Sequence, residues 1–240
     1  MNHSYRDEKM SFKKISRYPL HNFQVRFIHN TALIEALERY SNGILLDVGC
    51  GDKPYRNLTQ SLNSMHIGID HPVSLHNKVN VGIFCTSYDI SLASHSIDTI
   101  LCAAVLEHLE KPSKALNEIF RILKPGGCLI KSAPLFWHIH EEPRDFYRYT
   151  KFGLQFLLNQ SGFDFIEIKP LSGFWITFGT ELAYYLQKFK RGLFRYVISF
   201  FVFIITFLQP HLDRGVFLDE NFTWMYLVTA KKPYSLVSND

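Results

Sequence analysis

Paired cysteines are missing from this sequence of 240 residues. The four cysteines stand far apart and form no CxxC pair, which argues against a disulfide framework and a structural zinc site. The first fourteen residues carry charges throughout and lack an apolar stretch of the length that a secretory signal requires. Repeats and low-complexity tracts are missing as well. We therefore expect a cytoplasmic protein whose cysteines are small buried side chains.

A dense basic surface is also missing. The chain has 26 Lys and Arg against 22 Asp and Glu, with a formal net charge of +4 and a pI of about 8.8. This balance is far weaker than that of a typical nucleic-acid-binding domain, so we expect no nucleic-acid partner. Apolar residues are abundant, at 47% of the chain against 20% charged residues. The composition therefore fits an ordinary globular domain with a full core.

Short apolar runs alternate with helical patterns along most of the chain. Residues 23–40 and 115–123 place apolar side chains at helical spacing, and the second pattern stops at Pro125-Gly126-Gly127. Strands that alternate with helices predict an α/β fold with a mostly parallel sheet and helices on both faces. The apolar runs predicted to form strands are 44–49, 65–70, 79–84, 97–104, 127–133, 163–170 and 224–232.

The first predicted strand ends in ILLDVGCGDKPY, which combines an acid with two glycines. Gly49 and Gly51 allow a sharp turn and a close approach to a ligand, since no Cβ intervenes. A dinucleotide fingerprint would place another glycine where this chain has Pro54. Asp47 would repel a pyrophosphate but suits a ligand that carries a cationic amine. S-adenosylmethionine has an ammonium and a sulfonium group and no phosphate.

The second predicted strand ends in an acid too. Asp70 follows Gly51 by nineteen residues, and a carboxylate in that place can accept hydrogen bonds from both hydroxyls of a ribose. Together Asp47 and Asp70 favour a ligand of the adenosine type. The structural alternatives are a strand-end cap for Asp47 and an Asx turn before His71-Pro72 for Asp70.

With these residues, and with SIDTILCAAVLEHLEKPSKALNEIFRILKPGGCLIKSAP further on, the chain resembles the class I S-adenosylmethionine-dependent methyltransferases of the bacterial small-molecule type. The resemblance covers roughly residues 41–170 and a last strand near 224–231. It implies a Rossmann-like, doubly wound sheet of seven strands, with a helical insertion before the last strand. It also implies an S-adenosylmethionine cofactor.

The resemblance implies the cofactor-binding residues as well. The methionine part would lie on Asp47, Gly49, Gly51 and the backbone near Cys102, and the ribose on Asp70. Two positions depart from the family's pattern: Lys53 stands at the third glycine of D-x-G-x-G-x-G, and Thr86 at the usual adenine-binding acid. We expect a reduced cofactor affinity and an adenine contact from the backbone near Ser87.

Further polar residues along this stretch need not take part in chemistry. We interpret Asp98 and the pair Glu107-His108 as structural. Arg121 we interpret as a solvated charge or as one that pairs with a neighbour on its own helix.

Residues 137–150, WHIHEEPRDFYRYT, gather the most unusual set of polar side chains. Methyl transfer needs little acid-base help beyond removal of one proton from the acceptor. We take His140 and Glu141 as candidates for the base or for residues that orient the acceptor. In a structural alternative, Asp145 and Arg148 form an ion pair and Thr150 caps the next helix. We expect no bound metal, because His138, His140 and Glu141 lack a fourth ligand at a recognisable spacing.

The organisation predicted for the chain has four parts. A basic segment and helix at 1–40 would cover the cofactor site, 41–172 would form the S-adenosylmethionine-binding core, 173–221 a hydrophobic helical insertion, and 222–240 the last strand and tail. The insertion combines an apolar stripe from Trp175 to Phe189, opposite Thr177, Glu181 and Lys188, with an apolar helix at 197–208. Twelve residues make a helix of roughly 18 Å, which is too short to span a bilayer alone.

The sequence thus predicts a methyltransferase that acts on a small acceptor, lipid-linked or otherwise apolar. We expect peripheral contact with the inner face of a membrane through 173–210, or a homodimer through the same surface. The alternatives are a non-catalytic S-adenosylmethionine-binding protein, a membrane-recruited partner protein and, with less support, a nicotinamide oxidoreductase.

Overall fold

A computed structural model describes residues 19–74, 79–214 and 218–234 of the chain. Contacts divide the molecule into two compact units. The sheet unit comprises Ala32–Lys169 and Met225–Asp240, and the helical unit comprises Met1–Thr31 and Pro170–Trp224. The predicted cover of the cofactor site involves residues 1–18, which lie outside the described part, and so it stays a prediction.

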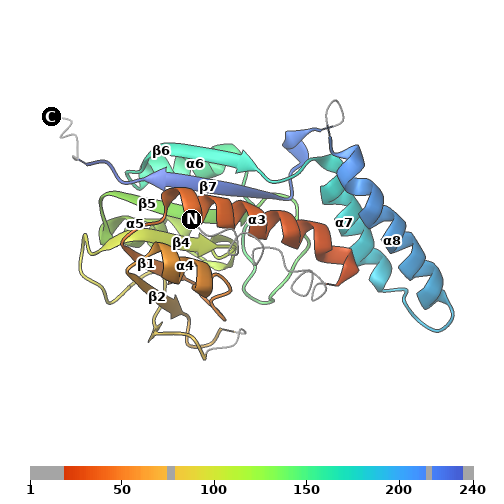
Figure 1. Cartoon of the computed structure of the whole chain (residues 1–240), viewed down its shortest axis with the longest axis horizontal. Helices are drawn as coiled ribbons and strands as arrows, with labels where there is room; N and C mark the ends of the chain where they lie inside the picture. Colours follow the sequence, from red (N-terminus) through yellow and green to blue (C-terminus); the bar gives the residue numbers. More distant parts are fainter. Residues whose placement is uncertain (1–18, 75–78, 215–217, 235–240) are drawn as a thin grey trace. The chain divides into compact units, whose positions relative to one another are not determined.

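Seven strands form a single sheet in the order β3-β2-β1-β4-β5-β7-β6 (Figure 1). Strand β1 pairs in parallel with β2 and β4, β2 also pairs in parallel with β3, and β4 with β5. The last strand, β7, runs antiparallel to β5. The strands are β1 Ile44–Val48, β2 Met65–Asp70, β3 Ile83–Phe84, β4 Ile97–Ala103, β5 Leu123–Pro134, β6 Asp164–Pro170 and β7 Met225–Lys231. The predicted α/β fold with a mostly parallel, Rossmann-like sheet is confirmed.

The crossover helices lie on the two faces of this sheet. Helix α4 (Arg56–Leu62) connects β1 to β2 on one face, and α5 (Pro112–Ile122) and α6 (Lys151–Gln160) lie on the other (Figure 1). Helix α5 begins with a proline, whose missing N–H costs nothing in a first turn. A short 3-10 helix, η2 (Leu106–His108), follows β4. The core residues that α5 buries against the sheet recur at helical spacing: Ala115, Leu116, Ile119 and Ile122.

The predicted boundary between α5 and β5 is wrong by several residues. The Pro125-Gly126-Gly127 segment lies inside β5, which begins directly after α5 at Leu123. The segment keeps an irregular backbone within the strand, since Gly126 has φ +77° and the register between β4 and β5 shifts from Ile97–Leu123 to Thr99–Cys128. Gly126 N donates to the Lys232 carbonyl at 2.8 Å, and Lys124 Nζ donates to both oxygens of Asp98 at 2.8 Å. The proline and glycines therefore mark a bulge in β5 and not the end of the helix.

Asp98 and Arg121 have the structural roles expected from the sequence. Asp98 accepts a hydrogen bond from the Ile44 amide at 2.8 Å and so fixes the start of β1. Arg121 pairs with Glu118 on its own helix at 2.8 Å. It also donates to the carbonyls of Ile90 and Leu92, so it anchors that loop as well.

The helical unit is built around an antiparallel pair of long helices. Helix α7 (Phe174–Gln187) packs on α8 (Phe194–Leu212), and the 3-10 helix η1 (Leu20–Asn22) contacts both. Helix α3 (Phe23–Tyr40) begins in this unit and continues into the sheet unit, and a 3-10 helix, η4 (Glu220–Phe222), precedes β7. Gly179 allows the close approach of the two long helices, because a Cβ there would lie 2.5 Å from Gln209 Nε2.

Small and polar side chains, rather than large apolar ones, line the contact between α7 and α8. Thr177, which the sequence placed opposite the apolar stripe, is fully buried and bonds to Ser172 at 3.0 Å. The aromatic stripe of α7 is exposed, with Trp175 at 41% and Tyr185 at 55%. The exposed stripe belongs to the segment through which the sequence predicts contact with a membrane or a second copy of the chain.

Helix α8 is longer than the sequence predicted. It runs for 19 residues instead of twelve, which corresponds to about 28 Å. Phe194–Tyr196 add a turn before the apolar run, and Gln209–Leu212 extend it at the other end. By length and composition alone this helix could cross a membrane, and most of its apolar window is exposed. The prediction that this helix is too short to span a bilayer is therefore wrong.

Candidate active site

Side chains from several strands meet at the carboxyl edge of the sheet. Asp47 lies near the end of β1, Asp70 is the last residue of β2, and Cys102 lies near the end of β4. Because β1 pairs in parallel with both β2 and β4, these strand ends are neighbours. In an open α/β sheet this edge is where ligands bind. All the predicted cofactor residues belong to the sheet unit and follow or end one of its strands.

The turn after β1 takes a backbone conformation that few residues adopt. Gly49 has φ +69° and Gly51 φ +45°. A Cβ on Gly49 would lie 2.5 Å from a methyl group of Val105, so the glycine is required by space as well as by backbone. Lys53 stands where the family has its third glycine and still adopts φ +50°. Lys53 thus adopts a left-handed conformation that a glycine would adopt without strain.

Asp70 connects this turn to the end of β2. Its Oδ2 accepts a hydrogen bond from the Gly51 amide at 3.0 Å, and its Oδ1 accepts one from the His71 amide at 2.7 Å. The side chain is nearly buried. The second bond is to the next residue, so it is not the Asx turn expected as a structural alternative, which needs an N–H at Pro72. Each carboxylate oxygen retains a further lone pair that can accept from a hydroxyl.

Asp47 is buried and has a partner that the sequence did not reveal. Its Oδ2 lies 3.3 Å from Nε2 of His66, and Nδ1 of His66 lies 2.7 Å from the Thr59 hydroxyl. Burial raises the pKa of Asp47, and the contact with His66 and the charge of Lys53 oppose that rise. A cationic ligand would favour the ionised carboxylate. A single polar residue within an apolar strand, as His66 is in MHIGID, was the available signal.

Cys102 and Ser87 border the same edge. The Cys102 side chain is buried, and burial raises the pKa of its thiol to about 12. It therefore stays protonated, which suits a position where the backbone makes the contact. Ser87 lies in a tight turn after β3, in which the Asp89 amide donates to the Thr86 carbonyl at 3.3 Å. The predicted roles of both residues remain predictions.

The loop after β5 is held by an ion pair. Arg148 donates to both oxygens of Asp145, at 2.6 and 2.7 Å, and also to the carbonyls of Trp137 and His138. Thr150 caps α6 by accepting from the Gly153 amide at 3.1 Å. Both structural interpretations of these residues are confirmed. The ion pair lies in an irregular loop, not in a helix.

His140 lies in this loop together with Glu141. His140 Nδ1 is 3.3 Å from Asp145 Oδ2, and burial lowers the pKa of His140. A neutral imidazole at pH 7 can orient a hydroxyl or accept its proton. Glu141 adopts φ +53°, and its Oε2 lies 3.8 Å from Nε2 of His108.

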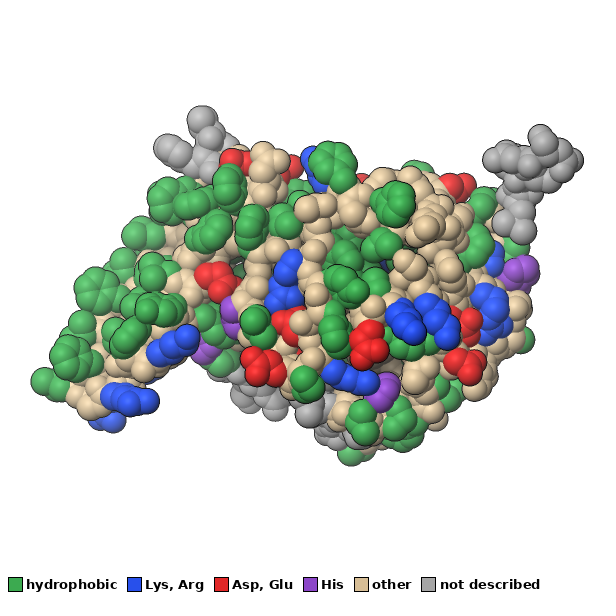
Figure 2. Space-filling view, turned by 180° about the vertical axis from the view of Figure 1, so that it is seen from behind, with side chains coloured by type: hydrophobic (Ala, Val, Ile, Leu, Met, Phe, Trp, Pro, Cys, Tyr) green, Lys and Arg blue, Asp and Glu red, His purple; other side chains and the backbone are tan. Residues whose placement is uncertain are grey.

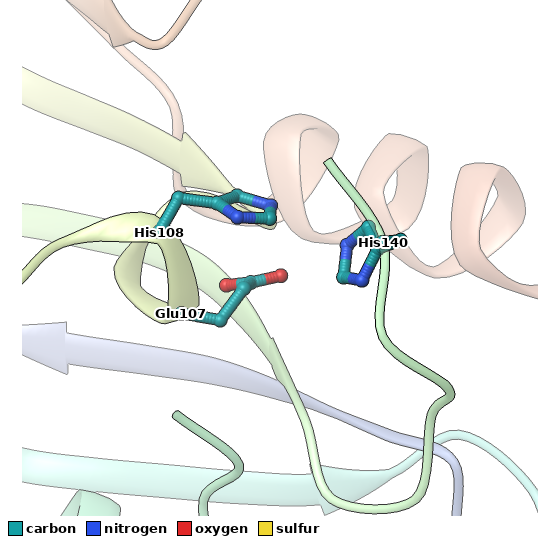
Figure 3. Close-up of side chains that lie close together, drawn as sticks. All are labelled: Glu107, His108 and His140. Carbon is teal, nitrogen blue, oxygen red and sulfur yellow. The ribbon is translucent and has the colours of Figure 1, made fainter. Parts of the chain in front are cut away.

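A group that sequence reasoning did not assemble lies beside His140. The rings of His108 and His140 pack edge to face, with centroids 4.8 Å apart, and the carboxylate of Glu107 points toward both (Figure 3). One ligand atom from each of the three residues lies within 4.8 Å of the others. Burial raises the pKa of Glu107 to about 7. The V-L-E-H motif was visible in the sequence, but its approach to the loop after β5 was not.

Comparisons with known proteins agree with this arrangement. Residues 46–131 match the family model of a methyltransferase domain. A crystal structure of an S-adenosylmethionine-dependent methyltransferase from Archaeoglobus fulgidus has the same fold, with a TM-score of 0.52 and 18% identity, over 84% of this chain and 94% of the other. Residues 46–131 are thus similar to a methyltransferase domain, and the fold is that of an S-adenosylmethionine-dependent methyltransferase.

Curated relatives are similar to this chain over part of their length. An uncharacterized protein of Methanocaldococcus jannaschii is 34% identical over 99 residues, which cover 41% of this chain and 44% of the relative. A ubiquinone biosynthesis O-methyltransferase of Saccharophagus degradans is 29% identical over 125 residues, or 48% of this chain and 50% of the relative. The chain thus spans half or less of these relatives.

The residues at the carboxyl edge fit S-adenosylmethionine, the cofactor of such methyltransferases. Asp47 and Asp70 are two nearly buried acids at the ends of adjacent strands, joined by a turn with glycine at its two tightest points. An ionised acid matches the amine of the methionine part, and an acid with spare lone pairs matches the two ribose hydroxyls. The turn has Pro54 where a dinucleotide-binding fingerprint would have a glycine.

Proposed function

We propose that the protein transfers a methyl group from S-adenosylmethionine to an apolar or lipid-linked acceptor at a membrane surface. The observation that carries the methyl-transfer part is the pair Asp47 and Asp70 on adjacent strand ends, within a domain that matches methyltransferases. When bound, the cofactor supplies an electrophilic methyl group. Asp47 would bind the methionine amine and Asp70 the ribose, with backbone contacts near Cys102 and Ser87.

On the acceptor side, we propose roles for His140 and Glu141. Asp145 lies against Nδ1 of His140, which favours a proton on that nitrogen and leaves Nε2 as an acceptor. His140 can then orient the acceptor or take its proton, and Glu141 lies one residue further along the same loop. Positioning would supply most of the acceleration, since methyl transfer is a displacement in line. One relative is named an O-methyltransferase, which supports an oxygen nucleophile.

The cofactor is tested by titrating the purified full chain with S-adenosylmethionine, S-adenosylhomocysteine and NADH. We expect the first two to bind and NADH not to bind. Binding of NADH alone would favour an oxidoreductase instead. Binding of S-adenosylmethionine without methyl transfer to any quinone, phenol or thiol tried would favour a non-catalytic binding protein.

The membrane part of the proposal rests on the hairpin of α7 and α8. Its outward surface is covered with hydrophobic side chains, and cationic side chains gather at its end (Figure 2). Patches of this kind mark surfaces that bind membranes or other proteins. The contact between the helices uses small residues such as Ala183 and Gly179, as helix pairs in membranes do. The exposed apolar residues of α8 and of the loop before it include Leu193, Phe194, Val197, Phe200, Phe201, Phe203, Phe207 and Leu208.

Charge makes an anionic bilayer the favoured partner of this surface. Lys188, Lys190, Arg191 and Arg195 are all exposed at the turn of the hairpin. Arg195 stacks on Tyr196 with its guanidinium 4.6 Å from the ring centroid, and Lys188 lies 5.3 Å from the ring of Tyr185. Cations that flank aromatic surface are attracted to anionic lipid headgroups.

Sedimentation with liposomes of phosphatidylcholine and phosphatidylserine tests the membrane contact. We expect the full chain to pellet at low salt, and a variant with Lys188, Lys190, Arg191 and Arg195 changed to Gln to stay in the supernatant. A matched control changes four exposed lysines of the sheet unit to Gln, namely Lys111, Lys114, Lys151 and Lys169. The control removes the same charge and should pellet like the unchanged chain.

Two outcomes would contradict membrane docking. The full chain would stay in the supernatant at low salt, or the hairpin variant would pellet as well as the control. A dimer in analytical ultracentrifugation that dissociates when Phe200, Phe203 and Phe207 are changed to Ser would assign the surface to a second copy of the chain.

A further inference from the structure

We propose that Glu107, His108 and His140 bind one divalent transition-metal ion. The inference rests on the proposed function in one respect, because the ion would lie where the acceptor is proposed to bind. With the ion on its Nε2, His140 would orient the acceptor through the ion, and Glu141 would be the residue that takes the proton. Three ligand atoms, one from each residue, lie within 4.8 Å of one another. The carboxylate of Glu107 and the two imidazoles face a common point (Figure 3).

The carboxylate of Glu107 lacks any other partner in the described part of the chain. It is fully buried, and neither of its oxygens has a hydrogen bond there. A buried carboxylate without hydrogen bonds is expensive, and such groups in proteins are paired or coordinate metals. The backbone of Glu107 is well fixed, since its carbonyl accepts from the Phe146 amide at 2.9 Å. A bound cation would stabilise the ionised form of this buried carboxylate, whose pKa burial raises to about 7.

Both histidines have their Nδ1 atoms engaged, and Nε2 of His108 lies 3.8 Å from Oε2 of Glu141. Nδ1 of His108 lies 2.5 Å from the Arg144 carbonyl, so this nitrogen carries the proton. Nδ1 of His140 lies 3.3 Å from both the His138 carbonyl and Asp145 Oδ2. Metal-bound histidines in proteins donate their other ring N–H to a carbonyl or a carboxylate in this way. The supporting contacts of a metal site are thus already in place.

The donor set indicates which ion would bind. Two imidazoles and one carboxylate suit zinc, cobalt, manganese or iron better than magnesium or calcium, which prefer oxygen ligands. Ligand atoms around tetrahedral zinc lie about 3.3 Å apart, so the side chains would need only small rotations to close on the ion. Three protein ligands leave open positions, as in catalytic rather than structural zinc sites. An acceptor oxygen or sulfur could occupy one of them, and Glu141 lies beside His108.

A competing explanation is that Glu107 only balances the buried charge of Lys131. The side chain of Lys131 is fully buried, and its Nζ lies 5.8 Å from the centroid of the Tyr149 ring. Among the described residues no ion pair joins Lys131 to Glu107. If Glu107 served Lys131 alone, the substitution Glu107→Gln would weaken the fold and leave the affinity for metal unchanged.

The test measures metal binding by the full chain without cofactor or acceptor. Chelator-treated protein is titrated with Co²⁺, followed by its visible absorption, and with Zn²⁺ by calorimetry. We expect one ion per chain, tetrahedral or five-coordinate cobalt bands, and a rise in melting temperature with Zn²⁺. Glu107→Gln and His140→Ala should each lower the affinity at least about 100-fold. His138→Gln, next to the site but outside it, is the matched control and should bind like the unchanged chain.

Three results would overturn the metal site. They are the absence of Co²⁺ and Zn²⁺ binding at millimolar ion, equal affinity in the Glu107→Gln and unchanged chains, or an equal loss in the His138→Gln control. Titration of S-adenosylmethionine is run separately on the same metal-free samples. A chain that binds the ion but not the cofactor would refute the proposed function and leave the metal site standing. The reverse result would refute the metal site alone.

Discussion

At the scale of single residues, Asp70 serves the turn and the proposed ribose site with one carboxylate. Asp70→Ala removes the acceptor for ribose hydroxyls and also frees the Gly51 amide. We expect the affinity for S-adenosylmethionine to fall by roughly 10- to 150-fold, equivalent to about 1.5 to 3 kcal/mol. Calorimetry on the folded variant measures this. Asp70→Asn keeps one acceptor oxygen and should lose less, and an unchanged affinity in a folded Ala variant would remove Asp70 from the site.

Asp47 is predicted to lower the stability of the free protein and to raise its affinity for S-adenosylmethionine. Burial raises its pKa, so ionisation of this carboxyl group costs stability in the free protein. Asp47→Asn should therefore melt no lower than the unchanged chain, while it binds S-adenosylmethionine about tenfold more weakly at low salt. The difference should shrink at high salt, because the lost interaction is between charges. Calorimetry at two salt concentrations decides, and equal binding by both proteins at both salts contradicts the ammonium contact.

The residues of the cofactor turn could be predicted from the sequence, and those of the cluster around Glu107 could not. Asp47, Gly49, Gly51 and Asp70 end predicted strands, so their neighbourhood follows from the parallel pairing alone. Glu107 approaches His140 only because η2 is bonded to the loop after β5, through the Phe146 amide. That contact joins segments some forty residues apart and leaves no periodic signal in either.

At the scale of elements, one acid fixes the start of α7. The Asp213 carboxylate, just beyond α8, accepts from the amides of Gly173, Trp175 and Ile176 at 2.7, 3.0 and 3.2 Å. Asp213→Ala should cost at least about 1 to 2 kcal/mol of stability, since three amides at a helix N-terminus lose their acceptor. Hydrogen exchange should accelerate at those three amides.

Thr150→Ala is the matched control for this cap, because it removes a cap from α6 instead. Its effect should appear at the Gly153 amide and leave α7 protected. Equal exchange of the α7 amides in the Asp213→Ala and unchanged chains would show that water replaces the carboxylate without cost.

The two long helices, α7 and α8, show which features a periodic sequence pattern predicts and which it does not. The apolar stripe of α7 predicted a helix correctly, but not that Thr177 and Thr180 are buried. The length of α8 was underestimated because an apolar run measures composition, while the helix continues through Arg195 at one end and His211 at the other. Hydrogen bonding along a helix does not stop where hydrophobicity does.

At the scale of the whole molecule, His29 predicts a response of the fold to acid. Burial, and the positive charge of Arg26, lower the pKa of His29 to about 4, against about 6.5 in an unfolded chain. The folded state thus keeps His29 neutral while the unfolded state takes up a proton. Stability is complete above pH 6.5 and falls as the pH drops from 6.5 to 4, by at most about 3 kcal/mol.

Denaturation of the full chain at pH 7.0, 5.5 and 4.5 measures this loss. His29→Gln cannot titrate, so the variant should lose less stability over the same range. Nuclear magnetic resonance of the His29 ring gives the pKa directly, and a value near 6.5 would contradict the prediction.

The order of the elements made the sheet the most predictable feature of the molecule. Seven apolar runs became seven strands, because alternation with helices leaves few ways to build a parallel sheet. The division into a sheet unit and a helical unit was not evident, since each unit draws on segments from both ends of the chain. Residues far apart in sequence share no local pattern that would announce their association.

The position of β7 has a consequence for how the chain is made. Strand β7 lies between β5 and β6, yet it leaves the ribosome about ninety residues after β5 ends. At about 5 to 20 residues per second, the edge of β5 waits roughly 5 to 20 seconds for its partner. The aromatic surface of α8 emerges during that interval. A nascent chain stalled before Met225 would therefore present an open strand edge together with an apolar helix, a combination that chaperones retain and that aggregates without them.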